Sequence, residues 1–85
     1  MTSRERVRAA AVEAGWRTTS DQRAPWNRMI LICRTQAGNP HRLVIWFSAD
    51  DRVLSADHEF GDGQHTRLDP GVDEVLWHVT FWGAL

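Results

Sequence analysis

Apolar residues recur three or four positions apart near the start of the chain: Val7, Ala10, Ala11 and Ala14. This spacing places them on one face of a helix. Thr2 and Glu5 stand three positions apart, as in a capping box, and Gly15 supplies the left-handed residue that commonly ends a helix. The pattern therefore predicts a helix between Thr2 and Gly15, with Trp16 folding back onto its last turn.

Two apolar runs, residues 29–33 and 43–47, follow a polar stretch. The polar residues 17–27 predict a connecting loop. Gly38, Asn39 and Pro40 separate the two runs, which indicates a hairpin with a longer loop. Neither run alternates between apolar and polar residues, so both sides of each strand need to be covered. Two helices can cover one face of such a sheet, and no further element is left for the second face.

The segment from residue 52 to residue 60 alternates, with Leu54, Ala56, His58 and Phe60 on one side and Ser55, Asp57 and Glu59 on the other. This alternation predicts a half-exposed third strand. Asp62 and Gly63 are a strong signal for a two-residue hairpin turn. A short fourth strand is expected over residues 64–68.

The C-terminal segment, residues 72–83, carries signals for both kinds of element. Asp69 and Pro70 make a good helix N-cap and first position. One helical face would carry Val72, Val75, Leu76, Val79 and Trp82. A strand would instead place Trp77, Val79 and Phe81 opposite His78 and Thr80. The start signals favour the helix, and the strand stays open as the alternative.

These elements predict an α+β fold of one small domain that spans residues 1–85. The predicted order is α-β-β-β(-β)-α, with helices packed on one face of an antiparallel sheet. A chain of 85 residues, 42% hydrophobic and 25% charged, has the composition of one globular domain.

Charge and cysteine content exclude several classes of protein. Ten arginines stand against eleven acidic residues, and the net charge of -1 gives no general attraction for nucleic acid. Cys33 is the only cysteine, which excludes an intrachain disulfide and a multi-cysteine zinc site. The sequence shows no signal-peptide core and no apolar window of membrane-spanning length. A cytoplasmic location is therefore expected.

Five tryptophans in so short a chain point to an interface. A domain of this length buries only about 60–65% of the surface that its unfolded chain exposes, so surplus aromatic side chains are expected to meet a second molecule. The expected interface residues are Val44, Trp46, Trp77, Phe81 and Trp82. The sequence thus predicts a homodimer that acts as a non-catalytic protein-binding module.

The alternative is a nucleic-acid-binding domain. Arg4, Arg6 and Arg8 lie on the helix face opposite the alanines, which is more typically a solvated face. Arg4, Arg8 and Arg17 would then contact phosphates.

The histidines raise one metal hypothesis. With a two-residue turn at Asp62 and Gly63, His58 and His65 would lie diagonally on one face of the sheet and could bind a metal. The competing interpretation is a polar hairpin without a ligand, which we favour because the spacing matches no known ligand pattern. His41 is expected to be solvated, and His78 to be a core or interface residue. No cofactor or metal is expected.

No catalytic arrangement is evident along the chain. Ser20, Ser48, Ser55 and Cys33 lack the local turn or loop context of a nucleophile. Cys33 lies in an apolar run, which is typical of an inert core thiol. We therefore expect a protein that is not an enzyme.

Two resemblances add expectations. The opening helix, its Ala14-Gly15-Trp16 end, the β-meander and the closing helix resemble in order the double-stranded-RNA-binding-like fold, and the opening is similar to that of small HicA-type toxin ribonucleases. The catalytic histidine of that family, after a glycine and a serine in the first hairpin, has no counterpart here. The lysine-free, arginine- and tryptophan-rich composition resembles small accessory proteins of actinobacterial phages and prophages. That resemblance implies a role in binding a host protein in the host cytoplasm.

Overall fold

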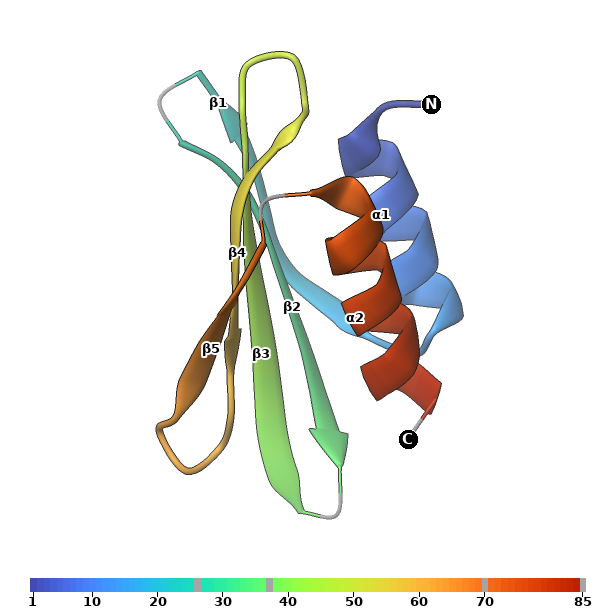
Figure 1. Cartoon of the computed structure of the whole chain (residues 1–85), viewed down its shortest axis with the longest axis vertical. Coiled ribbons are helices and arrows are strands. Elements are labelled where there is room, and N and C mark those ends of the chain that lie inside the picture. The colour runs from blue at the N-terminus through green and yellow to red at the C-terminus, as the bar shows by residue number, and fades with distance from the viewer. Residues whose placement is uncertain (26, 37, 70, 85) are drawn as a thin grey trace.

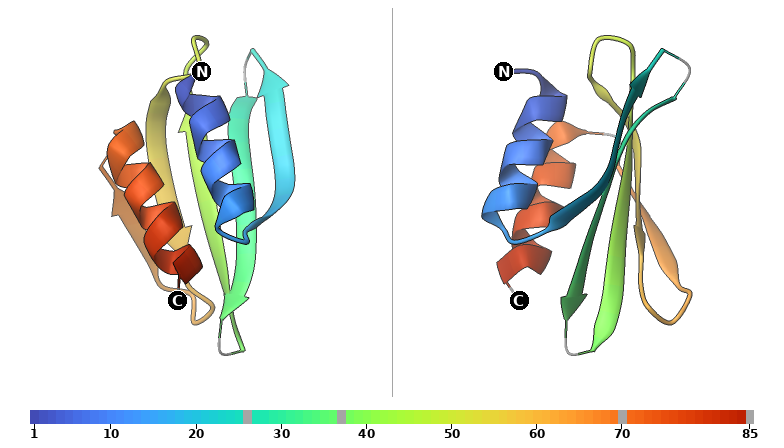
Figure 2. Two further views of the ribbon diagram at one scale, coloured as in Figure 1. Left: turned by 90° about the vertical axis from the view of Figure 1, so that its right-hand side faces the viewer. Right: turned by 180° about the vertical axis from the view of Figure 1, so that it is seen from behind.

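The structure is a computed structural model that describes residues 1–25, 27–36, 38–69 and 71–84. Its elements within these residues are α1 (Ser3–Glu13), β1 (Arg17–Ala24), β2 (Asn27–Gln36), β3 (Asn39–Phe47), β4 (Val53–Glu59), β5 (His65–Leu68) and α2 (Val72–Ala84). The strands form one antiparallel sheet in the order β1-β2-β3-β4-β5. Both helices lie side by side on the same face of the sheet (Figures 1 and 2). The predicted α+β fold, with helices on one face of an antiparallel sheet, is confirmed.

Helix α1 begins and ends as its sequence predicts. The Glu5 N–H donates to the Thr2 hydroxyl at 3.1 Å, and the Thr2 N–H donates to the Glu5 carboxylate at 3.4 Å. Gly15 has a φ of 88°, and the Trp16 N–H donates to the Ala11 carbonyl at 2.9 Å. The chain therefore reverses after α1, and the Trp16 ring is buried.

Residues 17–24 form an edge strand, so the predicted connecting loop was wrong. β1 pairs with β2 from Arg17 opposite Cys33 to Ala24 opposite Asn27, with one irregularity between Thr18 and Ser20. Polar residues suffice here because hydrogen bonds to β2 hold an edge strand without an apolar period.

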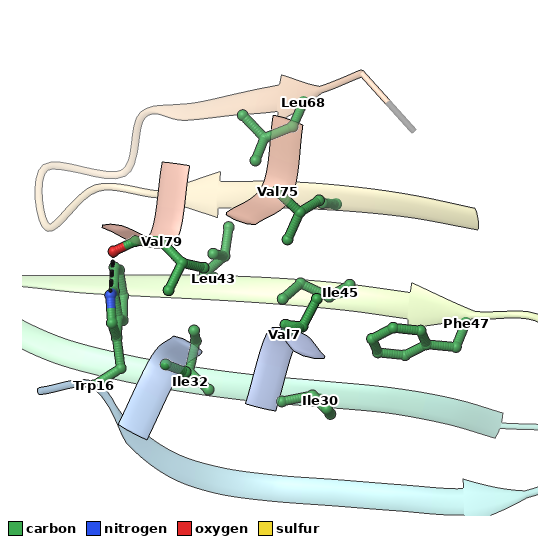
Figure 3. Packing of buried hydrophobic residues seen from close by; sticks show 12 residues of the cluster. Val7, Trp16, Ile30, Ile32, Leu43, Ile45, Phe47, Leu68, Val75 and Val79 are labelled. Atoms are coloured by element: carbon green, nitrogen blue, oxygen red, sulfur yellow. Dashed lines mark hydrogen bonds between the residues drawn. The ribbon is translucent and has the colours of Figure 1, made fainter. Parts of the chain in front are cut away.

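The predicted hairpin of β2 and β3 is confirmed. Five inward apolar side chains of this hairpin are buried: Ile30, Ile32, Leu43, Ile45 and Phe47. The helices add Val7, Ala11, Val75 and Val79 to the same core (Figure 3). The Trp16 indole N–H donates to the Val79 carbonyl at 2.9 Å, which joins the end of α1 to α2 across this core.

The hairpin of β4 and β5 is real, but its turn is longer than predicted. Glu59 pairs with His65 and His58 with Thr66. The Phe60 N–H donates to the Gln64 carbonyl at 2.7 Å. This shifts the register by one residue from that of a two-residue turn, and such a shift moves side chains to the opposite face. The short strand β5 itself is confirmed.

Residues 72–84 are helical, which confirms the favoured interpretation of the C-terminal segment. The Val75 N–H donates to the Gly71 carbonyl at 3.2 Å in the first turn. Pro70, predicted as the first helical position, lies outside the described residues. Val75 and Val79 are fully buried while Trp77 is exposed, so the helical period, and not the strand period, sorts these side chains.

Candidate functional site

The helices α1 and α2 leave one face of the sheet uncovered (Figure 2). This face carries apolar side chains. Across β2 and β3, Met29 pairs with Trp46 and Leu31 with Val44. Trp46 is 40% exposed, and the other three are partly buried. Together with Leu54 we call these residues the outer apolar patch.

Leu54 joins this patch through a bulge in β4. Trp46 pairs with Ser55, but Phe47 pairs with Val53, so Leu54 is the additional residue. Val53 packs against the core, whereas Leu54 is 58% exposed. The alternating sequence predicted Leu54 on the same side as Ala56, and the bulge overturns that prediction because it places two consecutive residues opposite one.

The other end of this outer face is charged, with both signs present. Arg42 Nε lies 3.3 Å from Glu59 Oε2, and His65 Nδ1 lies 3.3 Å from Asp57 Oδ1. Arg67 pairs with Asp57 across β4 and β5. Because the charges alternate in sign, two such faces would not repel each other as single-sign surfaces do.

A second exposed aromatic group lies on α2. The rings of Trp77 and Phe81 are one helical turn apart and stack with a centroid distance of 4.9 Å and an angle of 7°. Trp77 is 59% exposed and Phe81 is 43% exposed. Val75 and Val79 occupy the buried side of α2, so this pair faces away from the sheet.

The five predicted interface residues therefore lie in three places. Val44 and Trp46 share the outer apolar patch, and Trp77 and Phe81 form the stacked pair on α2. Trp82 is partly buried and packs against the core, with its ring centroid 5.0 Å from that of His58.

The arginines of the nucleic-acid alternative do not gather on one surface. Arg4, predicted on a solvated helix face, is 3% exposed. Its guanidinium contacts the Asp21 carboxylate, donates to the Gln22 carbonyl at 2.9 Å and lies 5.2 Å from the Phe47 ring centroid. Only Arg17, of the three proposed, is exposed without an ion pair to Asp21.

Asp21 explains this arrangement. Its carboxylate pairs with Arg4 and Arg8 from α1 and with Arg23 from its own strand. Burial would raise the pKa of Asp21, but hydrogen bonds and attraction from Arg4 and Arg23 outweigh burial and hold this pKa below its usual value. The ionised Asp21 carboxylate thus occupies Arg4 and Arg8, the two α1 arginines that were expected to contact phosphates.

His58 and His65 do not form the metal-binding pair that a two-residue turn predicted. The register places them on opposite faces of the sheet, since His58 faces α2 and His65 contacts Asp57. Within the described parts of the chain, no group of three or more histidine, cysteine, aspartate or glutamate side chains is placed to hold a metal ion.

Two contacts join three histidines in a line through the interior. His41 Nδ1 lies 3.0 Å from His58 Nε2, and His58 Nδ1 lies 2.5 Å from His78 Nε2. All three side chains are buried, although His41 was predicted to be solvated. They come from β3, β4 and α2, and we call them the histidine chain.

Burial favours the neutral form of two members of the histidine chain, His58 and His78. Burial lowers the pKa of His58 to about 4, with smaller contributions from His78 and His41, and burial also lowers the pKa of His78. His58 directs a different ring nitrogen to each neighbour, so the three rings do not point toward one ion.

Sequence reasoning missed this chain because its contacts join residues 17 and 20 positions apart. One signal was present. In the alternation of β3 and β4, His41 and His58 fall on the same side as the core residues Leu43 and Ala56.

An open cavity of about 240 Å³ lies at the His41 end of the histidine chain. Its lining includes Asn39, His41, Phe60, Gly61, Asp62 and Gln64. This cavity gives water a route to an otherwise buried imidazole.

Cys33 is partly buried on the outer face and not in the core. Its sulfur lies 3.7 Å from the Thr19 hydroxyl. Its neighbours across the strands are Arg17 and Arg42. The predicted core position of this thiol is therefore wrong.

Comparison with known proteins found no matching family model and no similar curated protein or solved structure. No helix among the residues that the structure describes is long and apolar enough to cross a membrane.

Proposed function

We propose that this chain is a small, non-catalytic protein-binding module that forms a homodimer through the outer apolar patch. The observation that carries the proposal is the exposure of Trp46 and Leu54 on a sheet face that neither helix covers. Removing an uncovered apolar sheet face from water lowers the free energy, which favours association through that face.

A second copy is the occupant that suits this face. A twofold interface brings the same patch from each copy together, so Trp46 would meet the apolar patch of its partner. The charged end carries Arg42 and Arg67 beside Asp57 and Glu59, so each copy offers both signs to the other. This complementarity supports self-association.

The stacked Trp77 and Phe81 provide a separate surface for a further protein. They lie on α2, on the opposite side of the molecule from the outer apolar patch (Figure 1). Following the compositional resemblance to phage and prophage accessory proteins, the partner in this proposal is a host protein in the host cytoplasm.

The test is light scattering of the purified chain at tens of micromolar, with Trp46→Arg and Trp77→Arg as a matched pair of variants. Wild type should show twice the 9.7 kDa mass of one chain. Trp46→Arg should be monomeric, because losing a central aromatic residue costs about 2 kcal/mol or more, roughly a 30-fold weaker dimer. Trp77→Arg should remain dimeric.

A monomeric wild type would contradict the proposal. So would a dimer that Trp46→Arg leaves intact while Trp77→Arg breaks it, since α2 would then be the self-association surface. Circular dichroism of each variant shows that the fold is kept.

A further inference from the structure

We propose that the histidine chain is an acid-sensitive latch, which fastens α2 to the sheet when neutral and releases it on protonation. This inference does not depend on the proposed function. It rests on three contacting, buried imidazoles that join two strands to a helix.

The number of hydrogens on the six ring nitrogens decides whether the latch stays closed. Each of the two ring-to-ring contacts needs one hydrogen, and one outer nitrogen remains on His41 and one on His78. The neutral chain satisfies both contacts when its rings are oriented head to tail. One added proton is also accommodated, because both outer nitrogens can carry hydrogens. A second added proton forces two N–H groups to face each other, so one contact must break.

Of the two ring-to-ring contacts, the one between His58 and His78 breaks more readily than the one between His41 and His58. His41 and His58 lie on β3 and β4, which hydrogen bonds of the sheet hold together. His78 lies on α2, which side-chain packing and the hydrogen bond from Trp16 to Val79 hold against the sheet. Breaking the contact between His58 and His78 therefore loosens α2 and leaves the sheet paired.

Among the described residues, no carboxylate forms a hydrogen bond or an ion pair with His41, His58 or His78. The neighbours of His58 are aromatic, with the Phe60 ring stacked at 4.3 Å and Trp82 at 5.0 Å. Arg34 of β2 lies opposite His41 in the strand register. Its guanidinium carbon lies 5.6 Å from the Trp16 ring centroid, which places a cation on the inner face of the sheet.

The acidic groups of the neighbouring elements face elsewhere. On β4, Asp57 contacts His65 of β5 and Glu59 contacts Arg42 of β3, all on the outer face of the sheet. Asp57 is the last and weakest influence on His58.

Four further carboxylates lie on the elements around the latch. Asp62 lines the cavity beside His41, in the turn between β4 and β5. Asp73 and Glu74 are exposed in the first turn of α2, which precedes His78 by a full turn. On α1, Glu13 is exposed.

The sign of the effect follows from these positions. The ordinary pKa of His58 and His78 is 6.5, whereas in the latched state burial lowers the pKa of His58 to about 4 and also lowers that of His78. The latch is therefore fully effective above pH 6.5 and weakens as pH falls below that value. The released population can rise up to tenfold per pH unit for each proton taken up.

Hydrogen exchange of backbone amides, corrected for the intrinsic pH dependence of exchange, measures this opening in the full chain. The logarithm of the opening constant of α2 should rise by more than about one per pH unit between pH 6.5 and 5, because at least two imidazoles take up protons. Amides of β2 and β3 should keep their protection. His78→Gln keeps a donor and an acceptor and should lower the slope by about one.

The control is His65→Gln, which changes the fourth histidine, exposed on the outer face. It should leave the slope unchanged. The latch is overturned if the logarithm of the wild-type opening constant of α2 rises by less than about half a unit per pH unit. It is also overturned if His78→Gln and His65→Gln change this slope equally, or if acid accelerates amide exchange equally in α2 and in the β2–β3 hairpin. Should His78→Gln fail to fold at pH 7, the wild-type slope and the protection of β2 and β3 still decide.

Discussion

Asp21→Asn should be among the most damaging single substitutions of a polar residue in this chain. Arg4 is 3% exposed, and Asp21 is the carboxylate that compensates its charge. Asparagine keeps an amide oxygen that can accept a hydrogen bond from Arg4 but carries no charge. The buried guanidinium therefore keeps the Gln22 carbonyl at 2.9 Å and the Phe47 ring and loses its counter-ion. Removing one member of a buried ion pair typically costs about 3–5 kcal/mol. Native proteins have roughly 5–15 kcal/mol in total, so about a fifth or more of the stability is at stake.

The assay is urea unfolding followed by tryptophan fluorescence at pH 7, which reports the free energy of unfolding. Glu59→Gln is the matched control, because it breaks a pair with Arg42 at 3.3 Å that is exposed at the surface. Such pairs contribute at most about 1 kcal/mol. The double variant Arg4→Met with Asp21→Asn should recover at least about 2 kcal/mol relative to Asp21→Asn alone, since no charge is then left unpaired in the core.

The same pair has a pH signature. The pKa of Asp21 is lowered in the folded chain from its ordinary 3.8, so its contribution is complete above that value and is lost as pH falls through the folded-state pKa. Asp21→Asn should remove this acid-dependent part of the unfolding free energy. A cost of Asp21→Asn no greater than that of Glu59→Gln would refute the reasoning, because Arg4 would then not depend on its partner.

Two further substitutions test the packing. Trp16→Phe removes the donor to the Val79 carbonyl and should lower the unfolding free energy by about 1–3 kcal/mol, measured by urea unfolding; an unchanged midpoint would show that water replaces the indole. Gly61→Ala would place a Cβ 2.7 Å from Pro40 Cδ and should cost about 1–3 kcal/mol by thermal unfolding. Gly71→Ala, where the added Cβ has no neighbour within 4 Å, is its control, and equal losses for the two would contradict the steric explanation.

Short-range patterns in the sequence determined the helices and four of the strands, β2 to β5. The capping box at Thr2 and Glu5 and the left-handed Gly15 act within a few residues, so α1 was predictable from local chemistry alone. Apolar runs similarly located β2 and β3. The edge strand β1 escaped because its polar residues are held by hydrogen bonds to β2, and the sequence of β1 carries no apolar period.

The candidate interface was predictable only in part. The sequence singled out Trp46, Trp77 and Phe81 as aromatic surplus, and all three are exposed. It did not separate them into two surfaces, because that depends on how α2 packs on the sheet. It also counted Trp82 as an interface residue, although the helical pattern placed Trp82 on the face of Val75 and Val79, which packs on the core. It also placed Leu54 on the wrong side, since one bulged residue reverses the alternation.

The sequence by itself therefore determined what acts over a few residues: caps, turns, apolar strands and an excess of tryptophan. The tertiary structure alone decided which polar residues became interior. Arg4 is buried because the carboxylate of Asp21 on β1 pairs with it. His41, His58 and His78 are in contact because the register of β3 and β4 and the position of α2 on the sheet bring them together. Burial of a polar group depends on a partner that is distant in the sequence, and no local pattern records where that partner will lie.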